Sequence, residues 1–202
     1  MIDLQAQFGG IDIYLFDQLL RGRITRGMRI LDAGCGEGRN LVYLLREGFE
    51  VWGVDESPDA IEQIRMLAAK LAPRLSKDRF SVGSVEKLPH GDASMDVVIS
   101  SAVLHFARNE RQWTAMVDEM WRVLSPGGVF FSRLATTIGQ EGMLESLGGR
   151  RYVLLDGSER FLVDEAMLMA TTLRLGATLL DPLKTSVVQN LRSMATWVVR
   201  KE

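Results

Sequence analysis

The sequence predicts an α/β protein with a doubly wound, seven-stranded, mostly parallel sheet and helices on both faces. Apolar, strand-like runs alternate with helix-like segments along most of the chain, which is typical of a parallel sheet. The first run breaks into a glycine-rich turn that opens a helix, and the second run ends on a carboxylate. With 202 residues, 47% of them hydrophobic, residues 1–202 are predicted to form a single domain.

The first half of the chain contains clear helix boundaries. Gly48 follows a helical segment as a C-terminal cap. Ser57 and Pro58 begin the next helix as N-cap and first helical residue, and Pro73 lies beyond its end. The predicted elements are helices over 12–21, 39–47 and 58–71, and strands over 29–33 and 50–55.

The second half continues the alternation, with a Ser-Pro-Gly-Gly turn over 125–128 before the fifth strand. The predicted strands are 80–84, 95–100, 129–134, 178–183 and 194–200, and the predicted helices are 110–123 and 163–175.

Residues 135–160 form a long connection that contains five glycines. Connections longer than about 12–15 residues are usually functional or disordered, so we expect this one on the substrate side. Its arginines Arg150, Arg151 and Arg160, together with Arg133 before it, are candidates for binding an anionic substrate. Solvated surface arginines are the alternative interpretation.

The composition excludes several classes of protein. A net charge of −2 gives no reason to expect a nucleic-acid partner. No apolar run approaches 18 residues, and the first residues lack the features of a signal peptide, so we predict no membrane partner. The single cysteine, Cys35, excludes an internal disulfide and predicts a cytoplasmic protein. No metal is predicted, and the oligomeric state stays open.

The glycine turn predicts a ligand site. Gly34, Gly36 and Gly38 follow the first strand, and glycines there let a ligand approach the backbone closely. Asp55, at the end of the second strand, lies 21 residues after Gly34 and can accept hydrogen bonds from both hydroxyls of a ribose. This combination predicts a cofactor that contains adenosine.

The spacing of the glycines argues against a dinucleotide. A dinucleotide turn has the pattern G-x-G-x-x-G, but Arg39 occupies the place of its third glycine. Asp32, just before the turn, would repel a pyrophosphate and suit a cationic amino group.

The segments 32–39, 83–89, 96–105 and 124–128 resemble motifs of the class I S-adenosylmethionine-dependent methyltransferases, over about 29–201. The resemblance implies that the glycine turn lies under the methionine part of the cofactor. It also implies that Asp32 holds the amino group and Asp55 the ribose, while Ser84 and Val85 contact adenine. Members of the family often have Asp where this chain has Ser84. By the same resemblance, further cofactor contacts are expected from four residues: Tyr14, Cys35, Glu56 and Ser101.

The N-terminal segment 1–25, with Tyr14, is expected to cover the cofactor as a lid, as in similar enzymes. The run C-G-x-G-R-N with Tyr43-Leu44 resembles small-molecule branches of the family, such as the tellurite-resistance methyltransferases. Ser100-Ser-Ala-Val at the end of the fourth strand differs from the motif of the DNA amino methyltransferases and from the carboxylates of metal-dependent catechol-type enzymes. A small-molecule acceptor is therefore predicted.

His105, a few residues after the fourth strand, is the candidate catalytic residue. A histidine titrates near neutral pH and can take a proton from the acceptor as a general base. Packing or capping of the turn around it is the alternative. Two other functions stay open for the chain: a cofactor-binding regulatory protein without turnover, and a nicotinamide-dependent oxidoreductase.

Overall fold

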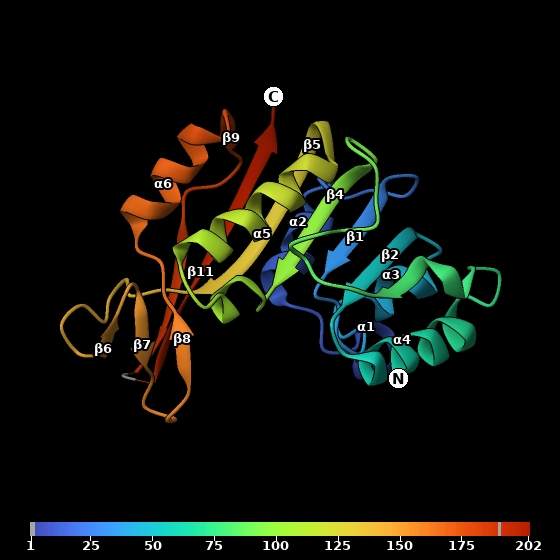
Figure 1. Cartoon of the computed structure of the whole chain (residues 1–202). Helices are drawn as coiled ribbons and strands as arrows, with labels where there is room; N and C mark the ends of the chain where they lie inside the picture. The colour runs from blue at the N-terminus through green and yellow to red at the C-terminus, as the bar shows by residue number, and fades with distance from the viewer. Residues whose placement is uncertain (1–2, 190) are drawn as a thin grey trace.

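The computed structural model describes residues 3–189 and 191–202, so the first two residues of the predicted N-terminal lid lie outside the described residues. A central sheet runs in the order β10-β11-β5-β4-β1-β2-β3, and β9 pairs with β11 (Figure 1). The five strands from β5 to β3 are parallel to one another. They are β1 (Arg29–Ala33), β2 (Glu50–Asp55), β3 (Phe80–Val82), β4 (Met95–Ser101) and β5 (Leu124–Ala135).

The remaining edge of the sheet is antiparallel. β11 (Arg192–Lys201) pairs with β5 along one side and with both β9 (Ala177–Leu179) and β10 (Lys184–Val188) along the other. β9 and β10 follow one another along the same edge, so the sheet is seven strands wide although it contains eight. The predicted fold class is confirmed, while the separate strand β10 was not predicted.

Alternation along the strands divides the core into two layers. Ile30, Val97 and Phe131 pack on one face of the sheet, and their chain neighbours Leu31, Val98 and Phe130 pack on the other. Both faces are covered by helices, as predicted (Figure 1). On the first face lie α2 (Ile13–Leu20), α3 (Val42–Arg46) and α4 (Pro58–Leu71), and on the second α5 (Glu110–Val123) and α6 (Glu165–Arg174).

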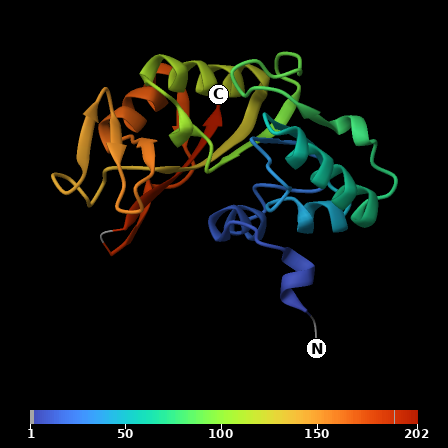
Figure 2. The same cartoon turned by 60° about the horizontal axis from the view of Figure 1, so that its bottom comes forward.

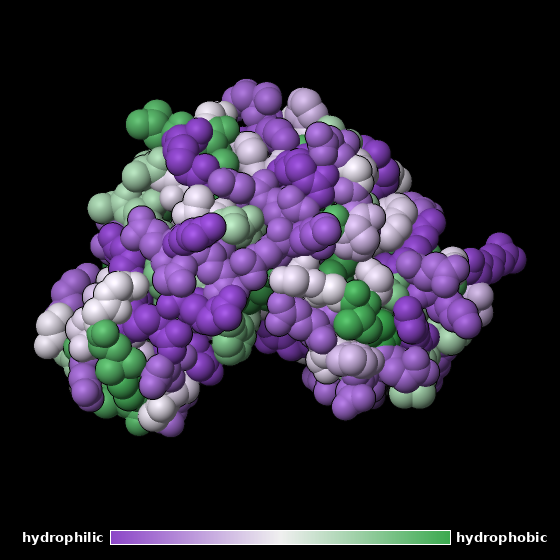
Figure 3. Space-filling view, viewed as in Figure 1, coloured by the Kyte–Doolittle hydropathy of each residue, from purple (hydrophilic) through white to green (hydrophobic). Residues whose placement is uncertain are grey.

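A second, three-stranded antiparallel sheet lies within the connection predicted over 135–160. It consists of β6 (Glu145–Gly148), β7 (Arg151–Val153) and β8 (Glu159–Phe161). Figure 2 shows this small sheet projecting from the central sheet on the side away from α1 (Leu4–Phe8). In Figure 3 the molecule is hollowed between the small sheet and the region of α4.

Several boundaries differ from the sequence prediction: the strand predicted over 178–183 is limited to β9, the strand predicted over 80–84 ends at Val82, and two further differences have a local cause. The predicted turn over 125–128 is a bulge inside β5, because one residue of β4, Asp96, stands opposite these four residues. The helix predicted over 39–47 shortens to α3, since Leu41 donates to the carbonyl of Gly38 and forms a turn before the helix. Two short 3₁₀ helices complete the fold, η1 (Lys77–Arg79) and η2 (Leu104–Phe106). Among the described helices, none has the length and apolar character that crossing a membrane requires.

Candidate functional site

A cavity of about 410 Å³ opens at the carboxyl ends of β1, β2 and β4. Ligands of open α/β sheets bind at this edge. Six of the predicted cofactor-binding residues line it, and six lining residues were not predicted. The predicted ones are Gly34, Gly36, Asp55, Glu56, Ser84 and Val85, and the others are Glu86, Ala102, Val103, Phe106, Gln112 and Met116.

The glycine turn forms the floor of this cavity, and two of its three glycines, Gly34 and Gly36, line it. Gly34 has φ +85°, and a Cβ there would come within 2.4 Å of Val103. Gly36 has φ +51°, and a Cβ there would meet no atom within 4 Å. Both positions favour glycine conformationally, but only Gly36 leaves open space toward the cavity. A ligand can therefore approach the backbone at Gly36.

Asp55 is fixed by two backbone groups. Its Oδ2 accepts from the N–H of Gly36 at 2.8 Å, and its Oδ1 accepts from the N–H of Ser57 at 2.9 Å. A carboxylate oxygen can accept more than one hydrogen bond, so both oxygens keep acceptor capacity toward the cavity. The carboxylate therefore holds the glycine turn against the end of β2 and remains able to accept from a ligand's hydroxyls.

Asp32 lies at the carboxyl end of β1, just before the turn, and is only 1% exposed. Neither of its carboxylate oxygens has a hydrogen-bond partner among the described residues. Desolvation by burial raises the pKa of Asp32 to about 8, and Arg39 opposes this shift in part. An unpaired buried carboxyl group is costly, so this group is suited to receive a cationic partner from a ligand.

The adenine side of the predicted site contains Ser84, Val85 and Glu86. The Ser84 hydroxyl accepts from the N–H of Glu86 at 3.3 Å, and the Glu86 carboxylate accepts from Gln112 at 2.7 Å. Gln112 and Met116 come from α5. Their place in the cavity depends on how α5 packs on the sheet, which no local sequence pattern indicates.

The charges that line the cavity have one sign. Asp55, Glu56 and Glu86 are its ionisable lining residues, and no lysine or arginine among the described residues joins them. A ligand with a negatively charged pyrophosphate would face three carboxylates without a counter-charge. The electrostatics therefore favour a ligand that carries positive charge.

Three predicted contacts at the turn do not line the cavity: Asp32, Cys35 and Gly38. Cys35 is buried, and its Sγ lies 2.8 Å from the position that a Cβ at Gly53 would take. Burial raises the pKa of the Cys35 thiol. A Cβ at Gly38, where φ is +86°, would come within 2.0 Å of Ile64 on α4. Cys35 and Gly38 pack the turn onto neighbouring elements.

His105 lies in η2 and is 8% exposed, outside the lining of the cavity. Its Nδ1 accepts from the N–H of Ala135 at 3.3 Å, so the neutral ring carries its proton on Nε2. Desolvation by burial, followed by the charge of Arg160, lowers the pKa of His105 to about 4. The ring is therefore neutral at pH 7 and holds the end of β5.

A second cavity, of about 260 Å³, adjoins the first, and Ala102 lines both. Ser101, at the end of β4, lines the second cavity and accepts from Arg39 at 3.2 Å. Tyr14 on α2 lines neither cavity, because its hydroxyl bonds to Ser186 at 2.7 Å and its ring lies 4.5 Å from the guanidinium of Arg133. The second cavity is lined by Asp12, Arg39, Ser101, Ala102, Arg133, Val188, Arg192 and Met194.

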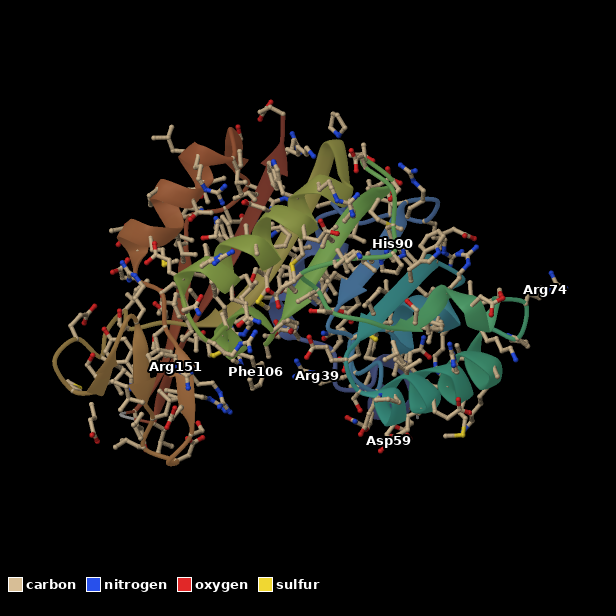
Figure 4. The ribbon with its side chains drawn as sticks, in the orientation of Figure 1. Arg39, Asp59, Arg74, His90, Phe106 and Arg151 are labelled. Atoms are coloured by element: carbon tan, nitrogen blue, oxygen red, sulfur yellow. The ribbon has the colours of Figure 1, made fainter. Side chains whose placement is uncertain are left out.

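The four arginines predicted for an anionic substrate do not come together. Arg150 pairs with Asp164 at 2.8 Å and Arg151 with Glu159 at 2.6 Å, both in or next to the small sheet. Arg160 lies 4.8 Å from the ring of Phe106, which lines the first cavity. Of these four arginines, only Arg133 lines the second cavity. Figure 4 shows Arg151 on the small sheet, apart from Arg39, which lines the second cavity.

Comparisons with known proteins agree with this geometry. Residues 30–128 match a family described as a methyltransferase domain. An uncharacterized methyltransferase of Synechocystis is 33% identical over 107 residues, covering 53% of this chain and 47% of that protein. A malonyl-[acyl-carrier protein] O-methyltransferase of Serratia marcescens is 32% identical over 123 residues, covering 60% of this chain and 42% of that protein. The matched region thus spans less than half of the length of these relatives.

Solved structures share the fold over most of the chain. A magnesium protoporphyrin IX methyltransferase of Synechocystis, solved with bound S-adenosylmethionine, is similar with a TM-score of 0.69 at 17% identity, covering 93% of this chain and 77% of that one. The [4+2]-cyclase SpnF is similar with a TM-score of 0.72 at 18% identity, covering 93% and 80%. The resemblance to class I methyltransferases predicted from the sequence is confirmed by the match of residues 30–128 to the methyltransferase domain family and by these relatives.

Proposed function

We propose that this protein transfers a methyl group from S-adenosylmethionine to a small-molecule acceptor. One observation carries the proposal: the buried Asp32 and Asp55 flank a glycine turn, and the charged residues that line the cavity above it, over the described residues, are all carboxylates. S-adenosylmethionine carries positive charge on its sulfonium and its amino group, which suits these carboxylates, and its ribose has hydroxyls that can donate to Asp55. The relatives named as methyltransferases support the same reaction.

The residues present fit the parts of this cofactor. Asp55 would accept from the ribose hydroxyls, and the unpaired Asp32 would receive the amino group. Ser84 and Val85 would contact adenine, and Gly36 leaves space for close approach. The bound cofactor supplies a methyl group on a good leaving group. The chain then needs mainly to align the acceptor with the methyl carbon, since such positioning can remove a large part of the activation barrier.

The N-terminal segment 1–25 is proposed as a lid, and residues 135–160 as a substrate-side element. A hydrogen bond between Tyr14 and Ser186 connects α2 to β10. Asp12, the N-cap of α2, lines the second cavity. The small sheet borders the hollow side of the molecule (Figure 3). We propose that both belong to one domain with the central sheet, and that the reaction takes place in the cytoplasm.

The general-base role of His105 stays a prediction. The Nδ1 of its ring is engaged by Ala135, and the ring lines neither cavity. These observations support a positioning role better, in which His105 holds the end of β5 next to Arg133.

Two alternatives are separable from the proposal. A nicotinamide-dependent oxidoreductase would need its pyrophosphate to lie against Asp55, Glu56 and Glu86. A binding protein without methyl transfer remains an alternative, since a protein named as a cyclase has the same fold. Titration calorimetry of the whole chain with S-adenosylhomocysteine and, separately, with NAD tests the cofactor. We expect micromolar or tighter binding of S-adenosylhomocysteine and none of NAD, and the reverse result would refute the proposal.

A further inference from the structure

We propose that the second cavity binds a small organic acid and that the acid's carboxylate oxygen accepts the methyl group, so that the product is a methyl ester. This inference rests on the proposed function, because it assigns the acceptor of the same site.

The charge of the second cavity is strongly positive. Three arginines, Arg39, Arg133 and Arg192, face a single carboxylate, Asp12. Asp12 is already paired with Arg133, with 3.1 Å between Oδ2 and Nε. Among the described residues, no carboxylate forms an ion pair with Arg39 or Arg192. Arg39 donates to Ser101 and its charge acts on Asp32, so an anionic ligand would mainly supply a counter-charge for Arg192.

Arg133, one of the residues that line the second cavity, is held in place. Arg133 donates to the hydroxyl of Thr196 at 3.0 Å, in addition to its pairing with Asp12 and its contact with the ring of Tyr14. A guanidinium fixed in this way loses little freedom when it binds an anion. Its planar fork of donors matches a carboxylate, with which arginine forms two parallel hydrogen bonds.

The position of the cavity suits an acceptor. Ala102, with φ +65°, separates it from the cofactor cavity and lines both. Ser101 and Arg133 stand opposite each other at the ends of β4 and β5. In Figure 4 Arg39, from the second cavity, and Phe106, from the first, both lie at the hollow side of the molecule. A ligand in the second cavity therefore lies next to the turn that holds the methionine part of the proposed cofactor.

The cavity also lacks, within the described part of the chain, a group that could deprotonate an acceptor. Asp12 is the only carboxylate in its lining and is paired with Arg133, and its lining contains no histidine. A carboxylic acid has a pKa of about 4 and is ionised at neutral pH without a base. A lone pair of the carboxylate oxygen forms the bond to the methyl carbon, and the carbon–sulfur bond breaks. Its electron pair stays on sulfur as a thioether, and no proton moves.

A substrate panel with the whole chain tests this assignment. Benzoate, cinnamate and monoethyl malonate are each compared with the corresponding primary amide, beside a thiol, a phenol and an amine. Formation of S-adenosylhomocysteine and of the methylated product is followed by mass spectrometry. We expect methyl esters from at least one acid and no product from its amide, because the amide has the shape of the acid but not its charge.

Variants then connect the activity to the cavity. Arg192→Gln is expected to raise KM for the accepted acid by about 10- to 100-fold, the effect of losing a charge-assisted hydrogen bond. The dissociation constant of S-adenosylhomocysteine should not change. Arg192→Lys keeps the charge and should have a smaller effect. Arg74→Gln is the matched control, since Arg74 lies at the far end of the molecule in Figure 4.

The possible results separate the two proposals. No binding of S-adenosylhomocysteine would overturn the proposed function itself. Binding of S-adenosylhomocysteine with no ester from any acid, or with turnover of the amine, phenol or thiol alone, would overturn this inference and leave the cofactor site standing. Equal KM values in wild type and Arg192→Gln would also overturn it.

Discussion

The N–H of Gly36 donates to the carboxylate of Asp55 at 2.8 Å, and this bond links two parts of the site that lie 19 positions apart in the chain. Gly36 belongs to the turn after β1, and Asp55 ends β2. The same carboxylate that is proposed to hold the ribose therefore also keeps the turn in its ligand-binding conformation. Mutations at the two positions should affect one function, the binding of cofactor.

We expect Asp55→Ala to weaken binding of S-adenosylhomocysteine by about 1.5–3 kcal/mol, because charge-assisted hydrogen bonds to the ribose are lost. Titration calorimetry measures the change, and circular dichroism verifies the fold. Asp59→Ala is the control, a carboxylate in the first turn of α4 that does not line the cavity. An unchanged dissociation constant for folded Asp55→Ala would remove the ribose assignment.

Gly36→Val should abolish binding of S-adenosylhomocysteine, since the branched side chain would fill the open space above the turn. The backbone strain of the substitution needs a matched control. Gly48→Val provides it, because Gly48 also has a positive φ, +72°, and a Cβ there would meet no atom within 4 Å, yet Gly48 does not line the cofactor cavity. If both variants bound equally well, the turn would not contact the ligand.

Asp32→Asn should stabilise the unliganded protein at pH 8 and weaken its binding of S-adenosylhomocysteine. The pKa of Asp32 is raised from 3.8 to about 8, so the folded state keeps a proton that the unfolded state has released. Stability therefore falls as pH rises from about 4 to about 8. We expect the free energy of unfolding of Asp32→Asn to exceed that of the wild type by at least about 1 kcal/mol at pH 8, which raises Tm by about 2–4 °C, and to change little at pH 4.

Thermal unfolding at pH 4 and pH 8 measures this difference, with Asp59→Asn as the control. Equal shifts of Tm at the two pH values would contradict the raised pKa of Asp32.

For His105 we expect His105→Asn to keep most turnover and His105→Leu to lose stability. Asparagine can offer an acceptor near the position of Nδ1, whereas leucine leaves the N–H of Ala135 buried without a partner, at a cost of about 1–3 kcal/mol. A loss of about 10²–10⁴ in turnover by His105→Asn, together with loss of an ionisation from the pH profile, would instead support the general base.

The lowered pKa of His105 should be visible in the pH dependence of stability, measured by thermal unfolding. Below pH 6.5 the unfolded chain takes up a proton that the folded protein excludes until about pH 4, so stability is lost as pH falls through this window. The loss amounts to as much as about 3 kcal/mol and should be absent in His105→Asn.

The sequence predicted the elements whose patterns are local. The glycine turn, Asp55 and the Ser57-Pro58 helix start each depend on a few adjacent residues, and the structure has all three. The small sheet was not predicted, because the residues of β6 are all exposed and so show no apolar alternation. β10 was missed for the same reason, since none of its residues is buried.

The second cavity could not be predicted from local patterns. Arg39 follows the glycine turn, and Arg192 lies more than 150 positions later at the start of β11. The pairing of β11 with β5 and of β10 with β11 brings Arg192 and Val188 to the cavity beside Arg133. Such convergence depends on long-range strand pairing, which residue spacing does not encode.

The two cavities differ in how far they lie within the segment that matches the methyltransferase domain family. Every residue that lines the cofactor cavity falls within 30–128, the segment shared with the methyltransferase domain family. Asp12, Arg133, Val188, Arg192 and Met194, which line the second cavity, all fall outside that segment. If the second cavity binds the acceptor, as we propose, exchanging α2 and the β10–β11 hairpin should change the acceptor and leave cofactor binding unchanged.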